Sequence, residues 1–360
     1  MVFKTYKMND MKGKQGLVCM GLLLVLSSCS CHTGKQITAS GLQRKDFQTE
    51  VNGQHTDLFT LSNKQGMEVC ITNYGARVVS ILVPDRNGKR EDVVCGFSTI
   101  TEYMEQRQNF GSTVGRYIGR ILNARFTLDG VEYKLVPNNG KSGHISHGGN
   151  PGFADRIWKV EQADTHRVRL SYLSPDGENG FPGNLKVTLV YSLGEDDNAL
   201  DLTYEATTDA PTVLNLSHHS FFNISGNFTK SVEDQQLWVD ADRFTPYDDK
   251  KCVTGEYLPV AGTPLDFRMP HTIGECIDAD HPQLKVVNGY DHTWELNTKG
   301  DDTRPAAWVY DPASGRKMEI FTTEPGMQIY TGNGLKGKMT GKGGIAYPFR
   351  SAVCFETMHF

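Results

Sequence analysis

The chain has 360 residues, which is enough for two ordinary domains or for one large all-β domain. Its content of 38% hydrophobic, 22% charged and 10% aromatic residues is typical of a globular protein and excludes a mainly disordered chain. The formal net charge is -5 and the Lys and Arg residues are scattered, which argues against nucleic acid as a partner and favours a small or neutral substrate.

Residues 1–28 are typical of a secretory signal peptide. Four lysines precede a short apolar run over residues 16–26, which is too short to span a bilayer comfortably. The run ends in LSSC at residues 26–29, which resembles the bacterial lipoprotein signal, in which the Cys becomes the lipidated first residue. We therefore expect an extracytoplasmic protein held at a bacterial membrane, in the periplasm or at the cell surface, by a lipid anchor on Cys29. Ordinary signal cleavage nearby is the alternative.

The cysteines indicate neither a zinc ribbon nor a redox pair. Of the eight, Cys19 lies in the predicted signal and Cys29 would be lipidated, and the others are widely spaced without a Cys-x-x-Cys motif. We expect most of these others to be buried as small hydrophobic side chains.

After a polar linker over residues 29–45, the chain consists of short β-type runs separated by turn residues. The clearest runs cover residues 67–72, 76–83, 168–173, 185–193 and 199–206. Residues 126–135 alternate around Asp129-Gly130, which is a strong hairpin signal. Only residues 99–107 predict a helix of more than two turns. Because no fixed repeat and no composition shift is evident, we predict an all-β fold, a single large antiparallel β-sandwich over residues 46–360.

Two segments with histidines are candidates for ligand contact. His144 and His147 lie in a Gly-rich loop, where backbone can approach a ligand closely and where two such residues can also ligate a metal. If residues 214–223 form a strand, its polar face carries His219, and His218 ends the core-facing row as a structural histidine. The polar face covers either bulk water or a wet cleft for a ring-shaped ligand, and it consists of Asn215, Ser217, His219, Phe221 and Asn223.

Two acidic residues are further candidates. Asp291 follows an Asn-Gly turn signal, a position at which Asp is more often a turn cap than a catalyst. Glu356 stands between Phe355 and Thr357 in a β-run, where a carboxylate costs free energy unless it is paired or used. Burial would raise the pKa of Glu356 toward the range that suits a general base.

An ordered set of motifs resembles the aldose 1-epimerase family, whose members are also called galactose mutarotases. The motifs are GRYIGRI (115–121), HGG (147–149), SPDGENGFPGN (174–184), NLSHHSFFNI (215–224), GTPLDFR (262–268), GYDH (289–292), TEPGMQIYTGN (323–333) and CFET (354–357). Each motif alone has modest specificity, but together they follow the family's order across nearly the whole chain after the linker.

The resemblance implies a β-supersandwich that interconverts the α and β anomers of a free aldose, such as glucose or galactose, without a metal or redox cofactor. Glu356 matches the general base that takes the proton of the C1 hydroxyl, and His219 matches the general acid that protonates the ring oxygen. His147 matches the second family histidine, and an aromatic such as Phe221 would cover the apolar face of the sugar. The matched sugar-binding positions are Arg120, Asp291 and Gln328.

The sequence departs from the family pattern at two places. The family's Arg-x-x-Asn-Arg motif has Gly119 in place of Asn, so we do not expect the hydrogen bond to the sugar that the Asn side chain would make. Met358 replaces a Gln, and the sequence stops at Phe360, whereas family members continue with a Pro-Asp-rich loop and final strands. We therefore expect Glu356 to lie near a chain end that frays unless its strand is well paired, beside an exposed sheet edge, in a chain with weakened activity.

Two alternatives to the enzyme remain open. One is a non-catalytic carbohydrate-binding lipoprotein on the same fold, which the short C-terminus makes plausible. The other is a metal-dependent β-sandwich or cupin-like enzyme that uses His144, His147 and His219.

Overall fold

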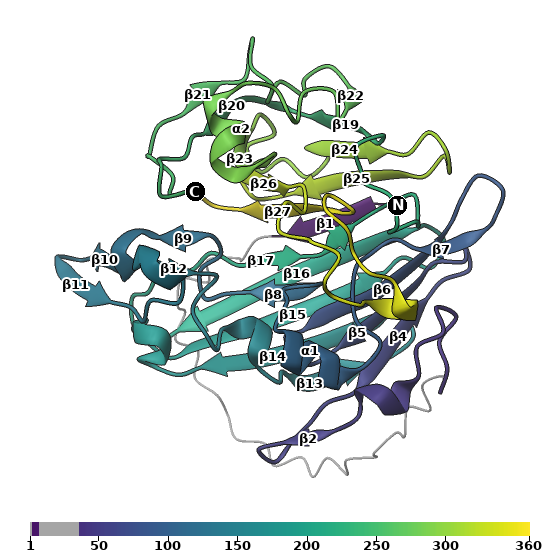
Figure 1. The fold of residues 1–360 in the computed structure, drawn as a ribbon. Helices are drawn as coiled ribbons and strands as arrows, with labels where there is room; N and C mark the ends of the chain where they lie inside the picture. The colour runs from purple at the N-terminus through teal and green to yellow at the C-terminus, as the bar shows by residue number, and fades with distance from the viewer. Residues whose placement is uncertain (1, 7–35) are drawn as a thin grey trace.

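The computed structural model describes residues 2–6 and 36–360, and strands predominate in them (Figure 1). The α-helices of the described residues are α1 (Ile100–Gln106) and α2 (Pro282–Val287), and several single 3₁₀ turns accompany them. Thr99 caps α1, because its hydroxyl accepts from the Glu102 N–H while the Glu102 carboxylate accepts from the Thr99 N–H. The helix predicted over residues 99–107 is confirmed, whereas α2 is too short to show helical periodicity in the sequence.

A nine-stranded sheet runs through the whole molecule. In spatial order its strands are β13 (Lys159–Ala163), β14 (Arg167–Ser174), β15 (Leu185–Leu193), β16 (Ala199–Thr208), β1 (Val2–Tyr6), β25 (Lys317–Thr322), β24 (Ala307–Tyr310), β19 (Gln236–Val239) and β22 (His271–Thr272). Neighbouring strands are antiparallel, except that β1 is parallel to both β16 and β25.

Two further sheets pack against this one. The four-stranded sheet has the order β4 (Leu58–Ser62), β5 (Glu68–Thr72), β6 (Arg77–Pro84) and β7 (Arg90–Asp92). The six-stranded sheet has the order β18 (Phe221–Phe222), β27 (Val353–Met358), β26 (Gly326–Tyr330), β23 (Asp291–Leu296), β20 (Ala241–Thr245) and β21 (Leu258–Pro259).

Short two-stranded sheets complete the architecture. They are β2 (Glu50–Val51) with β3 (Gln54–His55), β8 (Ser112–Val114) with β17 (Ser217–His219), β9 (Arg120–Ile121) with β12 (Ile145–Ser146), and β10 (Arg125–Leu128) with β11 (Val131–Lys134). The β10–β11 pair is the predicted hairpin, and its turn residues Asp129 and Gly130 both have positive φ, as a tight hairpin turn requires.

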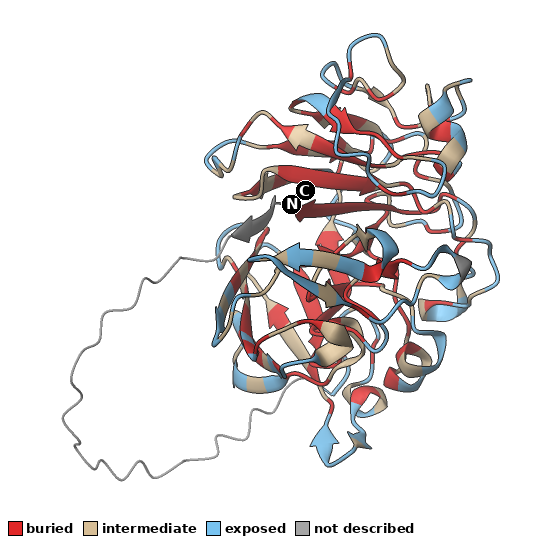
Figure 2. Ribbon diagram, turned by 90° about the vertical axis from the view of Figure 1, so that its left-hand side faces the viewer, coloured by how far each residue is buried: buried red, intermediate tan, exposed pale blue. Residues whose placement is uncertain are grey.

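One hydrophobic core joins the three large sheets. Ile81 of β6 and Leu189 of β15 belong to the same buried cluster, and so do Ile320 of β25, Trp294 of β23 and Ile329 of β26. Figure 2 shows buried residues along the strands in the interior, whereas the outer turns and loops are exposed. The predicted all-β, antiparallel sandwich is therefore confirmed, with one half of the long sheet packed on each of the smaller sheets.

The N-terminal region is described only in part. Residues 7–28 of the predicted signal peptide, and Cys29 itself, lie outside the described residues, whereas β1 lies between β16 and β25. The described part of the predicted linker packs on the fold, because Leu42 is buried in a cluster with Phe47. No helix in the described part of the chain is long and apolar enough to cross a membrane.

Arg116 lies inside the protein and crosslinks loops. The residue is 1% exposed. Its two terminal nitrogens donate hydrogen bonds to the carbonyl oxygens of Pro182 at 2.7 Å and Gly183 at 3.1 Å, and to the Ser174 hydroxyl at 2.6 Å. A buried cation is tolerated when most of its donors find acceptors in this way. Arg116 of the GRYIGRI motif therefore has a structural role.

We predict that Arg116→Met lowers the free energy of unfolding by about 3 kcal/mol, because buried acceptors lose their donors while the side-chain volume is kept. The measurement is urea denaturation. The matched control is Arg125→Met, an exposed arginine whose replacement should change stability by less than about 0.5 kcal/mol. Equal stability of the two variants would contradict this role.

Candidate active site

One cavity of about 620 Å³ brings together the residues that the sequence predicts as a site. Its lining includes residues from loops and strands that are far apart in the chain. Those predicted from the sequence are Arg120, His147, His219, Asp291, Gln328 and Glu356. Residues from across the motif set thus meet at one place, although His147 and Glu356 are more than 200 residues apart in the sequence.

Strand β27 carries Glu356 into this cavity. Every residue of β27 is buried, and the alternation of side chains places Phe355 in the main core while Glu356 faces the cavity. Glu356 pairs in register with Gln328 of β26, which pairs with Thr293 of β23. The three side chains therefore form a cross-strand row along the cavity wall.

The end of β27 is well held. Strand β26 pairs with it as far as Met358. The Asn215 side chain then forms two hydrogen bonds with the backbone of His359, donating to its carbonyl oxygen at 2.9 Å and accepting from its N–H at 3.0 Å. The fraying that we expect for Glu356 near the chain end is therefore opposed by pairing and by an amide clamp.

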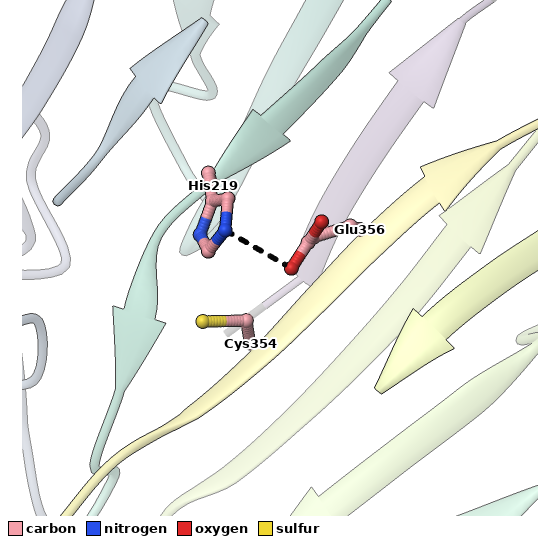
Figure 3. Close-up of side chains that lie close together, drawn as sticks. All are labelled: His219, Cys354 and Glu356. Carbon is pink, nitrogen blue, oxygen red and sulfur yellow. Dashed lines mark ion pairs between the residues drawn. The ribbon is translucent and has the colours of Figure 1, made fainter. Parts of the chain in front are cut away.

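His219 points toward Glu356 (Figure 3), and both residues line the cavity. Its Nε2 lies 3.3 Å from Oε1 of Glu356, and the two side chains are 7% and 4% exposed. The Phe221 ring stacks on the imidazole, with centroids 5.0 Å apart and planes at 16°. The predicted polar face is confirmed in part, because Asn215, His219 and Phe221 line the cavity. Ser217 and Asn223 do not line it, and the segment forms two short strands, β17 and β18, in different sheets instead of one strand over residues 214–223.

His147 adds a second imidazole beside the first. The ring centroids of His147 and His219 are 5.6 Å apart. The backbone of His147 has a φ of 53°, and its N–H donates to the Gly119 carbonyl at 2.9 Å, so the Gly-rich loop fixes the ring at the cavity.

The pKa values of the acidic and basic groups move in opposite directions. Burial, and then the nearby Asp291 carboxylate, raise the pKa of Glu356 well above its usual range, while Arg120 opposes the shift. Burial and the neighbouring His147 hold the pKa of His219 well below its usual range. Removal from water, with Arg120 nearby, lowers the pKa of His147 to about 4. These shifts favour the uncharged form of the Glu356 carboxyl and of both imidazoles in the free site.

The cavity also offers polar groups for hydroxyls beside Glu356. The Gln328 amide donates to Asp291 Oδ1 at 2.7 Å and to the Tyr247 hydroxyl at 3.0 Å. Arg120 donates to the Lys251 carbonyl at 3.0 Å, and its guanidinium lies 5.8 Å from the Tyr247 ring centroid. Acceptors and donors are thus fixed before any ligand enters.

Sequence reasoning missed three of these groups. Thr293, whose hydroxyl donates to Gln328, lies two residues after Asp291 on the same strand, so alternation alone could have identified it. Tyr247 and Lys251 belong to an irregular connection, where no periodicity marks a residue that faces a cavity.

His144 and His218 are not at the site. His144 is buried outside the cavity lining, and its Nδ1 accepts from the Asn123 N–H at 3.0 Å. His218 bonds to the Ser220 hydroxyl at 2.7 Å and is the structural histidine that the sequence predicts. Within the part of the chain that the structure describes, the one set of possible metal ligands is His219, Cys354 and Glu356, so the set His144, His147 and His219 is not formed.

Gly119 leaves space where the family has an amide side chain. Its φ is +80°, and a Cβ placed there would have Met358 Cε at 3.5 Å as its only near neighbour. The residue lines the cavity, so no side chain at this position reaches a bound sugar.

Comparison with known proteins agrees with this geometry. The family model described as aldose 1-epimerase matches residues 57–360. A galactose mutarotase of Sus scrofa is 39% identical over 302 residues, which cover 84% of this chain and 85% of that protein. An aldose 1-epimerase of Escherichia coli K12 is 36% identical over 286 residues, or 79% of this chain and 81% of that protein.

Solved structures show the same fold. An aldose epimerase homologue from C. elegans has a TM-score of 0.77 at 30% identity, covering 84% of this chain and 89% of that one. A galactose 1-epimerase from Lactobacillus acidophilus has a TM-score of 0.75 at 29% identity, covering 87% of this chain and 89% of that one. The sequence, the fold and the residues that line the cavity all agree, and this chain belongs to the aldose 1-epimerase family.

Proposed function

We propose that this protein interconverts the α and β anomers of free aldohexoses such as glucose and galactose, with Glu356 as general base and His219 as general acid. The assignment of base and acid rests on one observation, the 3.3 Å contact between these two buried groups at the wall of the cavity. Family membership supports the reaction.

Ring opening needs one proton to leave and another to arrive at atoms bonded to the same carbon. The Glu356 carboxylate takes the proton of the C1 hydroxyl, the C1–O bond gains double-bond character, and the bond from C1 to the ring oxygen breaks. The electron pair of that bond stays on the ring oxygen, which takes a proton from the His219 imidazolium. Rotation about C1–C2 presents the other face of the aldehyde, and the reverse transfers close the ring.

The pair needs only one proton in total. Before ring opening the proton is on His219, and afterwards it is on Glu356, so the two arrangements have the same charge. The raised pKa makes the Glu356 carboxylate the stronger base and the lowered pKa makes the His219 imidazolium the stronger acid, so moving the proton from His219 to Glu356 is favourable in the direction of ring opening. His147 is neutral at physiological pH and is placed to hydrogen-bond a sugar oxygen beside His219 without repelling the imidazolium.

The remaining polar groups are proposed to orient the sugar. Arg120, Asp291 and Gln328 present both donors and acceptors from one wall of the cavity. Holding the hydroxyls keeps C1 between the acid and the base, which removes much of the entropy cost of the reaction.

We also propose that the chain is exported and anchored by a lipid on Cys29. The support is the signal at residues 1–29. Cleavage before Cys29 would remove β1, the strand that β16 and β25 share. An anchored mutarotase would meet free sugars outside the cytoplasm.

Glu356→Gln should lower kcat by about 10²- to 10⁴-fold, because the amide cannot accept the proton, while KM changes much less. The measurement is polarimetry of freshly dissolved α-glucose and α-galactose. The matched control is Glu295→Gln on β23 of the same sheet, whose carboxylate pairs with Arg243 outside the cavity lining. A wild-type rate in Glu356→Gln refutes the role of Glu356, and saturable sugar binding without catalysis in the wild-type chain selects the binding protein instead.

The same variant predicts a pH dependence of stability. Because the pKa of Glu356 is raised, the folded protein keeps this proton at pH values where the unfolded chain, with a pKa of about 4.3, has released it. The stability that the protonated group contributes is complete below the unfolded pKa and is lost as pH rises toward the folded pKa. The unfolding free energy of Glu356→Gln minus that of wild type should therefore increase from acidic to neutral pH. A difference that does not change with pH would contradict the raised pKa of Glu356.

Cys29→Ser should abolish palmitate labelling and move the protein from the membrane fraction to the soluble fraction. Cys31→Ser, two residues later, is the matched control and should keep both properties. Mass spectrometry of the wild-type N-terminus should find modified Cys29 as the first residue. A wild-type chain that retains residues 2–6 would show that the predicted signal is not removed.

A further inference from the structure

Cys354 places a buried thiol next to Glu356 and His219, the proposed base and acid. Ligand atoms of His219, Cys354 and Glu356 all lie within 4.8 Å of one another (Figure 3). Ring opening of a hemiacetal needs an acid and a base but no thiol, so the proposed reaction gives Cys354 no task.

The backbone brings the three groups together. Cys354 and Glu356 are two residues apart on β27 and therefore project from the same face. Cys354 pairs in register with Phe221, which follows His219 by two residues. All three side chains are buried, and the His219 Nδ1 has no hydrogen-bond partner in the described part of the chain.

These three donors are those that zinc prefers. Thiolate sulfur, imidazole nitrogen and carboxylate oxygen bind Zn²⁺ at about 2.0 to 2.3 Å, which puts tetrahedral ligands about 3.3 to 3.8 Å apart. The imidazole and carboxylate are already 3.3 Å apart, and the thiol must approach by at most about 1.3 Å. Mg²⁺ and Ca²⁺ prefer sites made of oxygen alone, so the set discriminates against them.

We propose that His219, Cys354 and Glu356 form a zinc-binding site that, when occupied, blocks the acid and the base of the enzyme. The thiol releases its proton to solvent on binding, and water completes the coordination, as in zinc sites with three protein ligands. Zinc and a reacting sugar exclude each other, because both require the carboxylate and the imidazole.

Direct binding tests the site without reference to activity. Equilibrium dialysis against ZnCl₂ should find one zinc per wild-type chain. In Cys354→Ala the affinity for zinc should fall by more than about 10- to 100-fold. That range is the loss caused by removing a residue that only hydrogen-bonds to a ligand, and a direct ligand contributes more. Cys95→Ala is the matched control, since Cys95 is a buried thiol of the same apolar cluster outside the ligand set, and it should bind like wild type.

Inhibition is the second readout, and it alone rests on the proposed function. Zinc should stop mutarotation by wild type and Cys95→Ala, EDTA should restore it, and Mg²⁺ should have no effect. Cys354→Ala should keep its basal rate and resist zinc. Zinc binding without inhibition would support the site and contradict the catalytic roles of Glu356 and His219.

Two results overturn the proposal. One is wild-type protein that binds no zinc, and the other is Cys354→Ala that binds zinc as tightly as wild type. If Cys354→Ala does not fold, competition in the wild-type protein decides: saturating galactose should weaken zinc binding, and unchanged binding would overturn the site.

Discussion

The site depends on the contact between the Glu356 carboxyl and the His219 imidazole, two groups that are normally solvated at a protein surface. At neutral pH an exposed glutamate is ionised and an exposed histidine is mostly neutral. Burial favours the uncharged form of Glu356 and strengthens the same preference in His219, and the two groups lie 3.3 Å apart. In the proposed reaction, a sugar beside this pair gives one proton to Glu356 and receives another from His219.

The architecture exists in large part to hold this contact. Strand β27 is buried on both faces, with Phe355 in the core and Glu356 at the cavity, so the carboxylate cannot move without disturbing core packing. Pairing of Glu356 with Gln328 fixes its position along the strand, and Asn215 holds the backbone beyond it. His219 comes from a different sheet, so only the tertiary fold sets the distance between acid and base.

Local sequence patterns were sufficient to predict some of the residues at the site. Period-two alternation places His219 and Phe221 on one face, and a carboxylate within an apolar run marks Glu356, so both could be chosen from the sequence. Tyr247 could not, because its connection has no period. The meeting of Cys354 with His219 depends on the register of β18 with β27, which no local pattern encodes. Hydrophobic alternation also does not reveal that the polar segment around Leu42 packs on the fold.

The most direct test of the account is the titration of Glu356 itself. The carboxyl ¹³C resonance of Glu356, assigned by its absence in Glu356→Gln, reports the protonation of this one group in the ligand-free protein. The account predicts a midpoint well above that of an ordinary glutamate. A midpoint near the ordinary value of about 4.3 would show that the pair does not share a proton and would contradict the proposed exchange.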